Sequence, residues 1–221
     1  MRRISGRHLL LRWLNRGSDR ADGDAEAGGE VMVRDRRFKR RFEAAAAGDP
    51  SSCRWLWDHY AGPITGFLRA RGTPDADEVV NDVFLAAFSG LARFDGDESD
   101  FRAWLYRIAR NKRVDAIRRK GRRPVVFSSD DDLPGGDGSA ESEAIAALED
   151  AELRAVLDVL TPDQRDVIIL RFVSDLSLEQ TATAVDKPIG AVKSLQHRGL
   201  EQLRGRYSQQ PYPAHLSATM S

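Results

Sequence analysis

A stretch of turn-forming and acidic residues divides this chain into two parts. Residues 128–142 combine serine, glycine and proline with several aspartates. Such a composition disfavours regular structure and burial, and it is typical of a tether between folded domains. We therefore predict a flexible acidic linker at residues 125–145, with one small domain at residues 35–124 and another at residues 146–206.

Both predicted domains have the apolar spacing of helices. In the first, apolar residues recur at three- and four-residue intervals over residues 79–91 and again over residues 101–108. In the second, we predict a helix marked by the apolar residues at positions 153–160, followed by helices at residues 163–173, 178–185 and 189–206. No segment shows the sustained alternation of a half-buried strand. The predicted fold class is therefore all-α, with two small helical domains joined by the flexible linker.

The second domain has the pattern of a helix-turn-helix. Ser177 precedes one predicted helix, and Gln180 stands where the partner residue of a capping box is expected. Asp186-Lys187-Pro188 then interrupts the helical pattern, and aspartate tolerates the left-handed backbone of a tight turn better than most residues. Two helices joined by such a turn form a motif whose second helix can lie in the major groove of DNA.

Charge and reactive residues limit the classes of function. The chain has 34 lysines and arginines and 34 aspartates and glutamates, so any attraction to DNA must come from segregated charge. Cys53 is the only cysteine, and His8, His59, His197 and His215 show no metal-ligand or nucleophile–base spacing. We predict no enzyme activity, no cofactor and no metal site. Without a long apolar stretch, we also predict a cytoplasmic protein with no membrane insertion.

Three ordered stretches carry a family resemblance. The first covers residues 57–85 and includes the run Asp75-Ala76-Asp77-Glu78-Val79-Val80-Asn81-Asp82-Val83-Phe84-Leu85. The second covers residues 93–111 and includes Phe101-Arg102-Ala103-Trp104-Leu105-Tyr106. The third covers residues 160–198 and includes Leu160-Thr161-Pro162-Asp163-Gln164-Arg165 and Gly190-Ala191-Val192-Lys193-Ser194. Together they resemble regions 2 and 4 of the extracytoplasmic-function sigma factors of bacterial RNA polymerase.

The resemblance implies a surface for the clamp coiled coil of core polymerase. Its candidate residues are Asp77, Glu78, Asn81, Asp82 and Phe84. The carboxylates suit basic side chains across an interface. The alternative is a solvated polar face that the helix dipole favours.

The resemblance also implies a surface for the minus-ten element of a promoter. Its candidate residues are Arg107, Arg110, Asn111, Lys112, Arg113, Arg118 and Arg119. The cations would neutralise phosphates, and Asn111 suits a base edge, whereas the alternative is a solvated basic face. The loop at residues 95–100 is the implied pocket for an unstacked base, and its carboxylates are unfavourable beside DNA. We expect most aromatic residues around this loop to be core.

A third implied surface reads the minus-thirty-five element. Its candidate residues are Lys187, Lys193, Ser194, Gln196, His197 and Arg198. The family commonly has arginine and then an apolar residue after the Lys-Ser pair, whereas this chain has Leu195 and Gln196. We therefore expect direct readout to depend on Lys193 and Gln196.

The two ends of the chain are predicted to lie outside the domains, as a disordered leader at residues 1–34 and a tail at residues 207–221. A basic cluster spans the start of the first domain. It consists of Arg34, Arg36, Arg37, Lys39, Arg40 and Arg41. These cations form either a solvated helix face or a contact to DNA or polymerase.

The implied function is that of a sigma factor without covalent chemistry of its own. Its implied partners are core RNA polymerase, through the clamp coiled coil and the flap, and promoter DNA, with an anti-sigma factor as a further candidate. The main alternative is a non-sigma helix-turn-helix regulator whose first domain senses a ligand. That alternative needs a ligand-binding constellation in residues 42–120, and we find none there.

Overall fold

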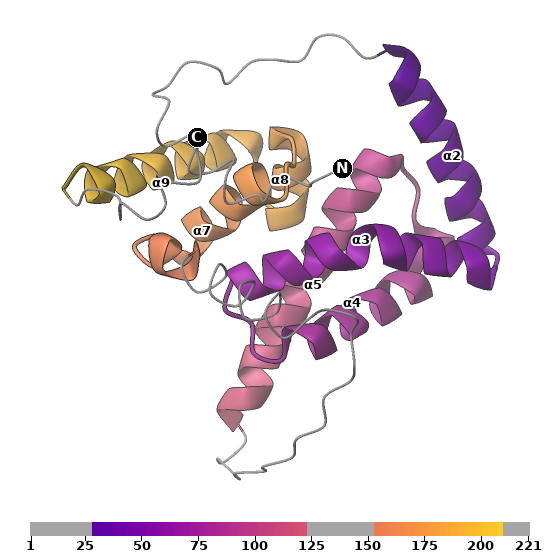
Figure 1. The fold of residues 1–221 in the computed structure, drawn as a ribbon, viewed down its shortest axis with the longest axis horizontal. Helices are drawn as coiled ribbons and strands as arrows, with labels where there is room; N and C mark the ends of the chain where they lie inside the picture. The colour runs from indigo at the N-terminus through magenta and orange to yellow at the C-terminus, as the bar shows by residue number, and fades with distance from the viewer. Residues whose placement is uncertain (1–27, 123–152, 210–221) are drawn as a thin grey trace, which may run out of the picture. The chain divides into compact units, whose positions relative to one another are not determined.

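This computed structural model describes the backbone of residues 28–122 and 153–209 and the side chains of residues 36–120 and 153–206. The described residues fall into two compact units that divide between Arg154 and Ala155. Every element in these ranges is helical (Figure 1), which confirms the predicted all-α fold. Most of the predicted leader, linker and tail lies outside the described residues, so these three predictions stay predictions.

The first unit is a bundle of long helices. Its elements are α2 (Gly28–Ala46), α3 (Pro50–Ala70), α4 (Ala76–Gly90), the short 3-10 helix η1 (Leu91–Arg93) and α5 (Glu98–Arg122). Helix α4 packs against both α3 and α5, and α2 packs against α3. Helix α2 begins before residue 35, where we placed the start of the first domain.

The core of the first unit joins an aliphatic stripe to an aromatic cluster. On α4 the predicted stripe is confirmed, because Val79, Val80 and Val83 are buried. The aromatic cluster brings Phe42 of α2 within 5.4 Å of Phe101 on α5, measured between ring centroids. This packing fixes the start of α5 against α2.

The second unit contains the predicted helix-turn-helix. Its elements are α7 (Pro162–Ile168), the π-helix η2 (Ile169–Val173), α8 (Leu178–Val185) and α9 (Ile189–Gln209). The predicted helix at residues 163–173 is therefore an α-helix only in its first part, and its end widens into π geometry. Residues 153–157, before α7, are also helical.

Local capping explains where the helices of the second unit begin. Thr161 and Gln164 form a capping box at α7, and Ser177 and Gln180 form the predicted capping box at α8. Asp186 ends α8 with a φ of 56°, so the predicted left-handed turn is confirmed. Among the described helices, none has the length and apolarity that crossing a bilayer requires.

Candidate functional surfaces

The exposed face of α4 is polar with one large apolar residue in its middle. Asp77, Asn81 and Leu85 stand four residues apart, so they lie on one side of the helix, with Glu78 beside them. Leu85 is 66% exposed, the most exposed of the large apolar side chains described. A single exposed leucine is common on protein surfaces, so the polar residues around Leu85 matter as much to this face as its exposure.

Phe84 lies in the core and not on this face, which corrects its place among the candidate contact residues. It is 2% exposed and packs against Trp57 and Phe88, with ring centroids 4.7 and 5.6 Å away. The sequence held the signal for the correct assignment, because Leu85 falls outside the spacing of the buried stripe. An apolar residue outside the stripe is the one that a helix presents to solvent.

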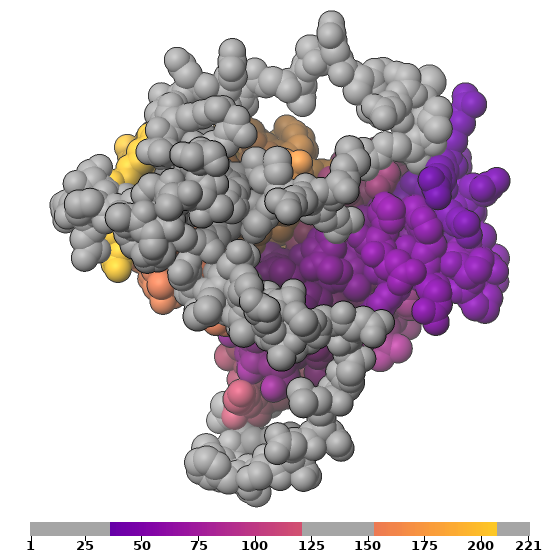
Figure 2. All heavy atoms as spheres, viewed as in Figure 1, coloured from indigo at the N-terminus to yellow at the C-terminus, as the bar shows by residue number. Residues whose placement is uncertain are grey.

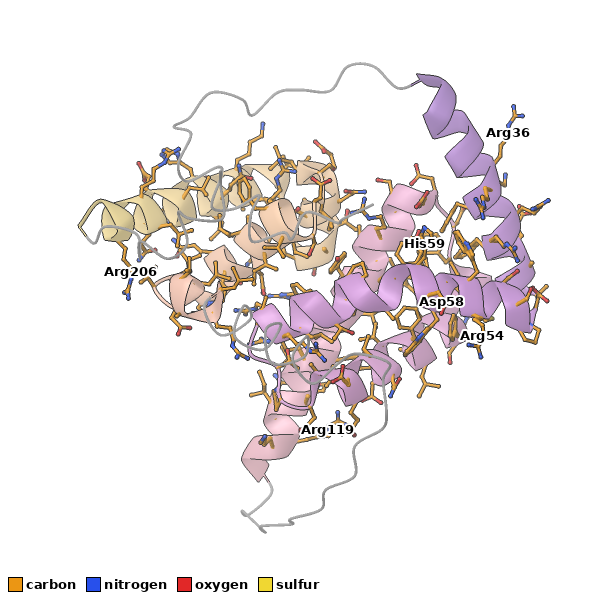
Figure 3. The ribbon with its side chains drawn as sticks, in the orientation of Figure 1. Arg36, Arg54, Asp58, His59, Arg119 and Arg206 are labelled. Atoms are coloured by element: carbon orange, nitrogen blue, oxygen red, sulfur yellow. The ribbon has the colours of Figure 1, made fainter. Side chains whose placement is uncertain are left out.

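Two carboxylates of the α4 face already have partners within the chain. Arg69 on α3 donates to both carboxylate oxygens of Asp77, each at 3.1 Å. Arg119 on α5 donates to Asp82 at 3.2 Å, and Figure 3 shows this arginine extending from the last turns of α5. The predicted polymerase surface and the predicted minus-ten surface are thus joined by an ion pair.

The outer face of α5 carries three exposed minus-ten candidates. Arg107, Asn111 and Arg118 share one side of the helix by their spacing, and all three are exposed. In Figure 1 the last turns of α5 extend past α4. The arginines at positions 107 and 118 have no ion-pair partner among the described residues.

The remaining minus-ten candidates are less exposed, and one of them is hydrogen-bonded within the chain. Arg113 faces inward, and its Nη2 donates to the carbonyl of Arg71 at 3.2 Å, so it holds the end of α3. Arg110 and Lys112 are half-buried. We therefore place Arg113 in the scaffold of this surface rather than on it.

The loop before α5 uses its carboxylates to build the helix start. The Asp97 carboxylate accepts from the backbone of Asp100 at 2.9 Å, and the Asp100 carboxylate accepts from the backbone of Asp97 at 3.2 Å. Tyr60 donates to Glu98 at 3.0 Å. A side chain at Gly96 would meet Asp100 at 2.7 Å, so this close turn requires glycine. These bonds explain why a loop predicted to hold a base contains so many acids.

The aromatic residues around this loop are mainly packing residues. Phe101 and Tyr106 are 1% and 4% exposed, which agrees with their predicted place in the core. Phe94 and Trp104 are half-buried and their rings lie 5.2 Å apart. Only these two keep part of a ring accessible beside the loop.

The exposed face of α9 contains four of the minus-thirty-five candidates. Lys193, Ser194, His197 and Arg198 are all exposed. His197 lies 3.3 Å from Glu201, and the Ser194 hydroxyl donates to the carbonyl of Gly190 one turn earlier. The serine oxygen still has free lone pairs, and Lys193 has no ion-pair partner among the described residues.

Gln196 faces the interior of the second unit, which corrects its expected role in readout. By its helical position it lies between the buried residues Val192 and Leu203. Its side-chain oxygen accepts from Arg171 Nε at 3.2 Å, and Arg171 also donates to the carbonyl of Leu176. Gln196 therefore fastens α9 to η2 and to the turn before α8.

Lys187 also differs from the other candidates of this surface. Its ammonium group pairs with Asp163 at 3.1 Å, and the side chain is 32% exposed. It links the turn before α9 to the start of α7. Of the two residues expected to carry direct readout, only Lys193 is exposed on α9.

Comparison with known protein families gives the class of this fold. The Sigma-70 region 2 model matches residues 56–123, and the Sigma-70 region 4 model matches residues 156–205. The first match covers α4, α5 and most of α3, and the second covers the helix-turn-helix. Fold and surfaces together define an RNA polymerase sigma factor.

Individual relatives narrow this class. The ECF RNA polymerase sigma factor SigD of Mycobacterium tuberculosis is 35% identical over 167 residues, which are 72% of this chain and 79% of SigD. SigW of Bacillus subtilis is 28% identical over 79% of this chain and 96% of its own length. The solved structure of CnrH in complex with the cytosolic domain of CnrY matches with a TM-score of 0.59 and 26% identity, over 77% of this chain and 96% of that chain. The chain therefore belongs to the extracytoplasmic-function sigma factors, and the non-sigma regulator is not favoured.

Proposed function

We propose that this sigma factor divides its contacts among three helices. The exposed face of α4 contacts core polymerase, the outer face of α5 contacts the minus-ten element, and the exposed face of α9 contacts the minus-thirty-five element. The observation that supports this division is the separation of side chains by type. The α4 face is acidic with one exposed leucine, whereas α5 and α9 each present cations without an intrachain ion-pair partner.

Leu85 is the proposed anchor of the core-polymerase surface. Protein interfaces commonly have a more apolar centre inside a polar rim. Glu78 and Asn81 supply such a rim, and Asp77 and Asp82 are held in place by their arginine partners. The acidic rim suits the basic side chains of a clamp coiled coil.

On the DNA side, phosphate contact and base readout fall to different residues. Arg107 and Arg118 bind phosphates and position the chain, and Asn111 between them reaches a base edge. On α9, Lys193 and Ser194 lie in the first turns, which are the part of a recognition helix that reaches bases. His197 and Arg198 lie further along the same face of α9 and contact the DNA backbone.

The proposal assigns no covalent step to this chain and places it in the cytoplasm, where promoter DNA lies. It also includes control by a protein inhibitor, because the relative CnrH is known in complex with the cytosolic domain of CnrY. An inhibitor that covered Leu85 would exclude core polymerase from the same surface. Region 4 is proposed to reach the polymerase flap in the assembled holoenzyme.

Run-off transcription tests the proposal. Purified bacterial core polymerase, this protein and a library of candidate promoters should give discrete start sites that depend on the factor. Leu85→Ser should weaken core binding at least tenfold, because it removes the apolar anchor, whereas Leu85→Met should retain binding. Stable DNA binding without core polymerase, together with no initiation on any template, would contradict the proposal.

A further inference from the structure

We propose that the outward face of α2, formed by Arg36, Arg37, Lys39 and Arg40, binds phosphates of the promoter strand that the neighbouring loop before α5 holds. This inference rests on the proposed function, and it adds a contact surface that lies outside the three helices described above. Its partner is DNA backbone, so the contact is independent of base sequence.

The four cations are accessible and unused by the protein. All four are exposed, and none has a hydrogen-bond or ion-pair partner among the described residues. By contrast, Arg69, Arg113 and Arg119 in the same unit each donate to a partner within the chain. Figure 3 shows Arg36 directed away from the other helices of this unit, and in Figure 2 the indigo surface of α2 is open to the viewer.

The inner face of α2 packs against the residues that flank the loop. Phe38 lies 5.6 Å from Phe101, and Phe42 lies 5.2 Å from Phe94, measured between ring centroids. Phe94 precedes the loop and Phe101 follows it, so α2 packs on both ends of the loop. The side chains at positions 38 and 42 are buried, Arg41 between them is half-buried, and the cations at positions 36, 37, 39 and 40 are exposed.

The charged residues of the loop at 95–100 are all acidic, and the nearest cations in sequence are Arg93 and Arg102. Asp97 and Asp100 are engaged with the loop backbone, and Asp95 is exposed, so the loop itself is negative. A strand held there meets carboxylates unless cations from another element offset them. Helix α2 packs on the residues that flank this loop, and among its described side chains it presents these four exposed cations and one exposed acid, Glu43.

The composition of the α2 face favours nucleic acid over a protein partner. The exposed large apolar residues of the described chain are Leu85, Ile117 and Ile189, and none of them is on α2. A protein interface usually has an apolar or aromatic centre, whereas phosphate binding requires only cations. The described α2 face has exposed cations and no large exposed apolar residue.

The salt dependence of promoter binding measures this surface directly. Each neutralised phosphate contributes about 0.7 to the slope of log affinity against log salt for a single strand. If all four cations engage phosphates, their removal lowers the slope by up to about 3. A quadruple variant removes the charge of this face and keeps side chains that can form hydrogen bonds. It combines Arg36→Gln, Arg37→Gln, Lys39→Gln and Arg40→Gln.

The experiment uses holoenzyme reconstituted from core polymerase and the full chain, with a fork promoter whose minus-ten strand is single-stranded. We expect the quadruple variant to lose salt slope and promoter affinity while its affinity for core polymerase stays unchanged. The matched control is Arg54→Gln on α3, an exposed cation that should leave the slope unchanged. A second variant, with lysine at positions 36, 37 and 40, should restore the slope because the charge returns.

Two results would overturn the inference while the proposed function stands. One is an unchanged slope in the quadruple variant, and the other is a loss confined to core affinity, which would assign the face to polymerase. If the unsubstituted protein forms no factor-dependent promoter complex, the proposed function and the inference both fail. Circular dichroism of each variant separates loss of charge from loss of fold.

Discussion

The two helices proposed to contact DNA are supported in different ways. Helix α5 starts in a capped loop, runs through an aromatic core and presents its basic end beyond α4 (Figure 1). Helix α9 presents its first turns instead, directly after a left-handed turn at Asp186. One surface therefore depends on a long, well-packed helix, and the other depends on the geometry of a turn.

This difference predicts which substitutions in each unit should impair DNA binding. On α5, the exposed cations Arg107 and Arg118 lie about three turns apart, so the loss of one leaves the other in place. At α9, the position of every contact residue depends on the connection to α8. The following predictions separate the two cases.

The largest expected effect is on the aromatic core that supports α5. Phe101→Ala removes a ring that is 1% exposed and should destabilise the first unit by about 3–5 kcal/mol. Thermal unfolding followed by two probes, one in each unit, measures this. The second unit should melt as in the unsubstituted protein, and an equal shift in both would contradict their independence.

A smaller effect is expected on α9. Lys193→Ala should cost about 1–3 kcal/mol in binding of the minus-thirty-five element if this lysine contacts a base. Competition between promoters that differ only in that element measures the cost. Gln196→Ala is the comparison, because its loss should appear as reduced stability of the second unit and not as altered base preference.

The turn at Asp186 should discriminate between substitutions by backbone conformation alone. Asp186→Val places a β-branched residue at a φ of 56° and should destabilise the second unit by about 1–2 kcal/mol. Asp186→Gly should be neutral or slightly stabilising, because glycine adopts this conformation without strain. Chemical denaturation measures the free energy of unfolding of both variants. Equal losses of stability would show that the turn requires the aspartate side chain and not only a left-handed backbone.

The smallest expected effect separates two adjacent arginines of α5. Arg118→Ala should lower the salt slope of promoter binding by about 0.7, since it removes one phosphate contact to the single-stranded minus-ten region. Arg119→Ala should change the slope less, because Arg119 is paired with Asp82. The same fork-promoter titration measures both, and a larger effect of Arg119→Ala would show that its ion pair opens on DNA.

The sequence was informative where structure is set locally. The capping box of Ser177 and Gln180 and the turn at Asp186 depend on residues close in the chain, and both were predicted correctly. The buried stripe of α4 follows from helical spacing, and it was also correct. Periodicity also separates Phe84 from Leu85, although only the structure showed how far Leu85 is exposed.

The sequence was not informative where a side chain bonds across helices. Gln196 bonds Arg171, which lies 25 residues earlier, and Arg113 bonds the carbonyl of Arg71, which lies 42 residues earlier. Such hydrogen-bond partners depend on how the helices pack, and no local sequence pattern predicts them. The π geometry of η2 was missed for a similar reason, because its sequence has ordinary helical spacing.

The ion pair between Asp82 and Arg119 has a consequence for chimaeric sigma factors. Asp82 is only 30% exposed, so a graft that replaces α5 while keeping α4 leaves a partly desolvated carboxylate without its counter-charge. Exchanging the two helices together avoids this mismatch. If α4 contacts polymerase and α5 contacts the promoter, as proposed, a junction outside the α4–α5 pair preserves this ion pair.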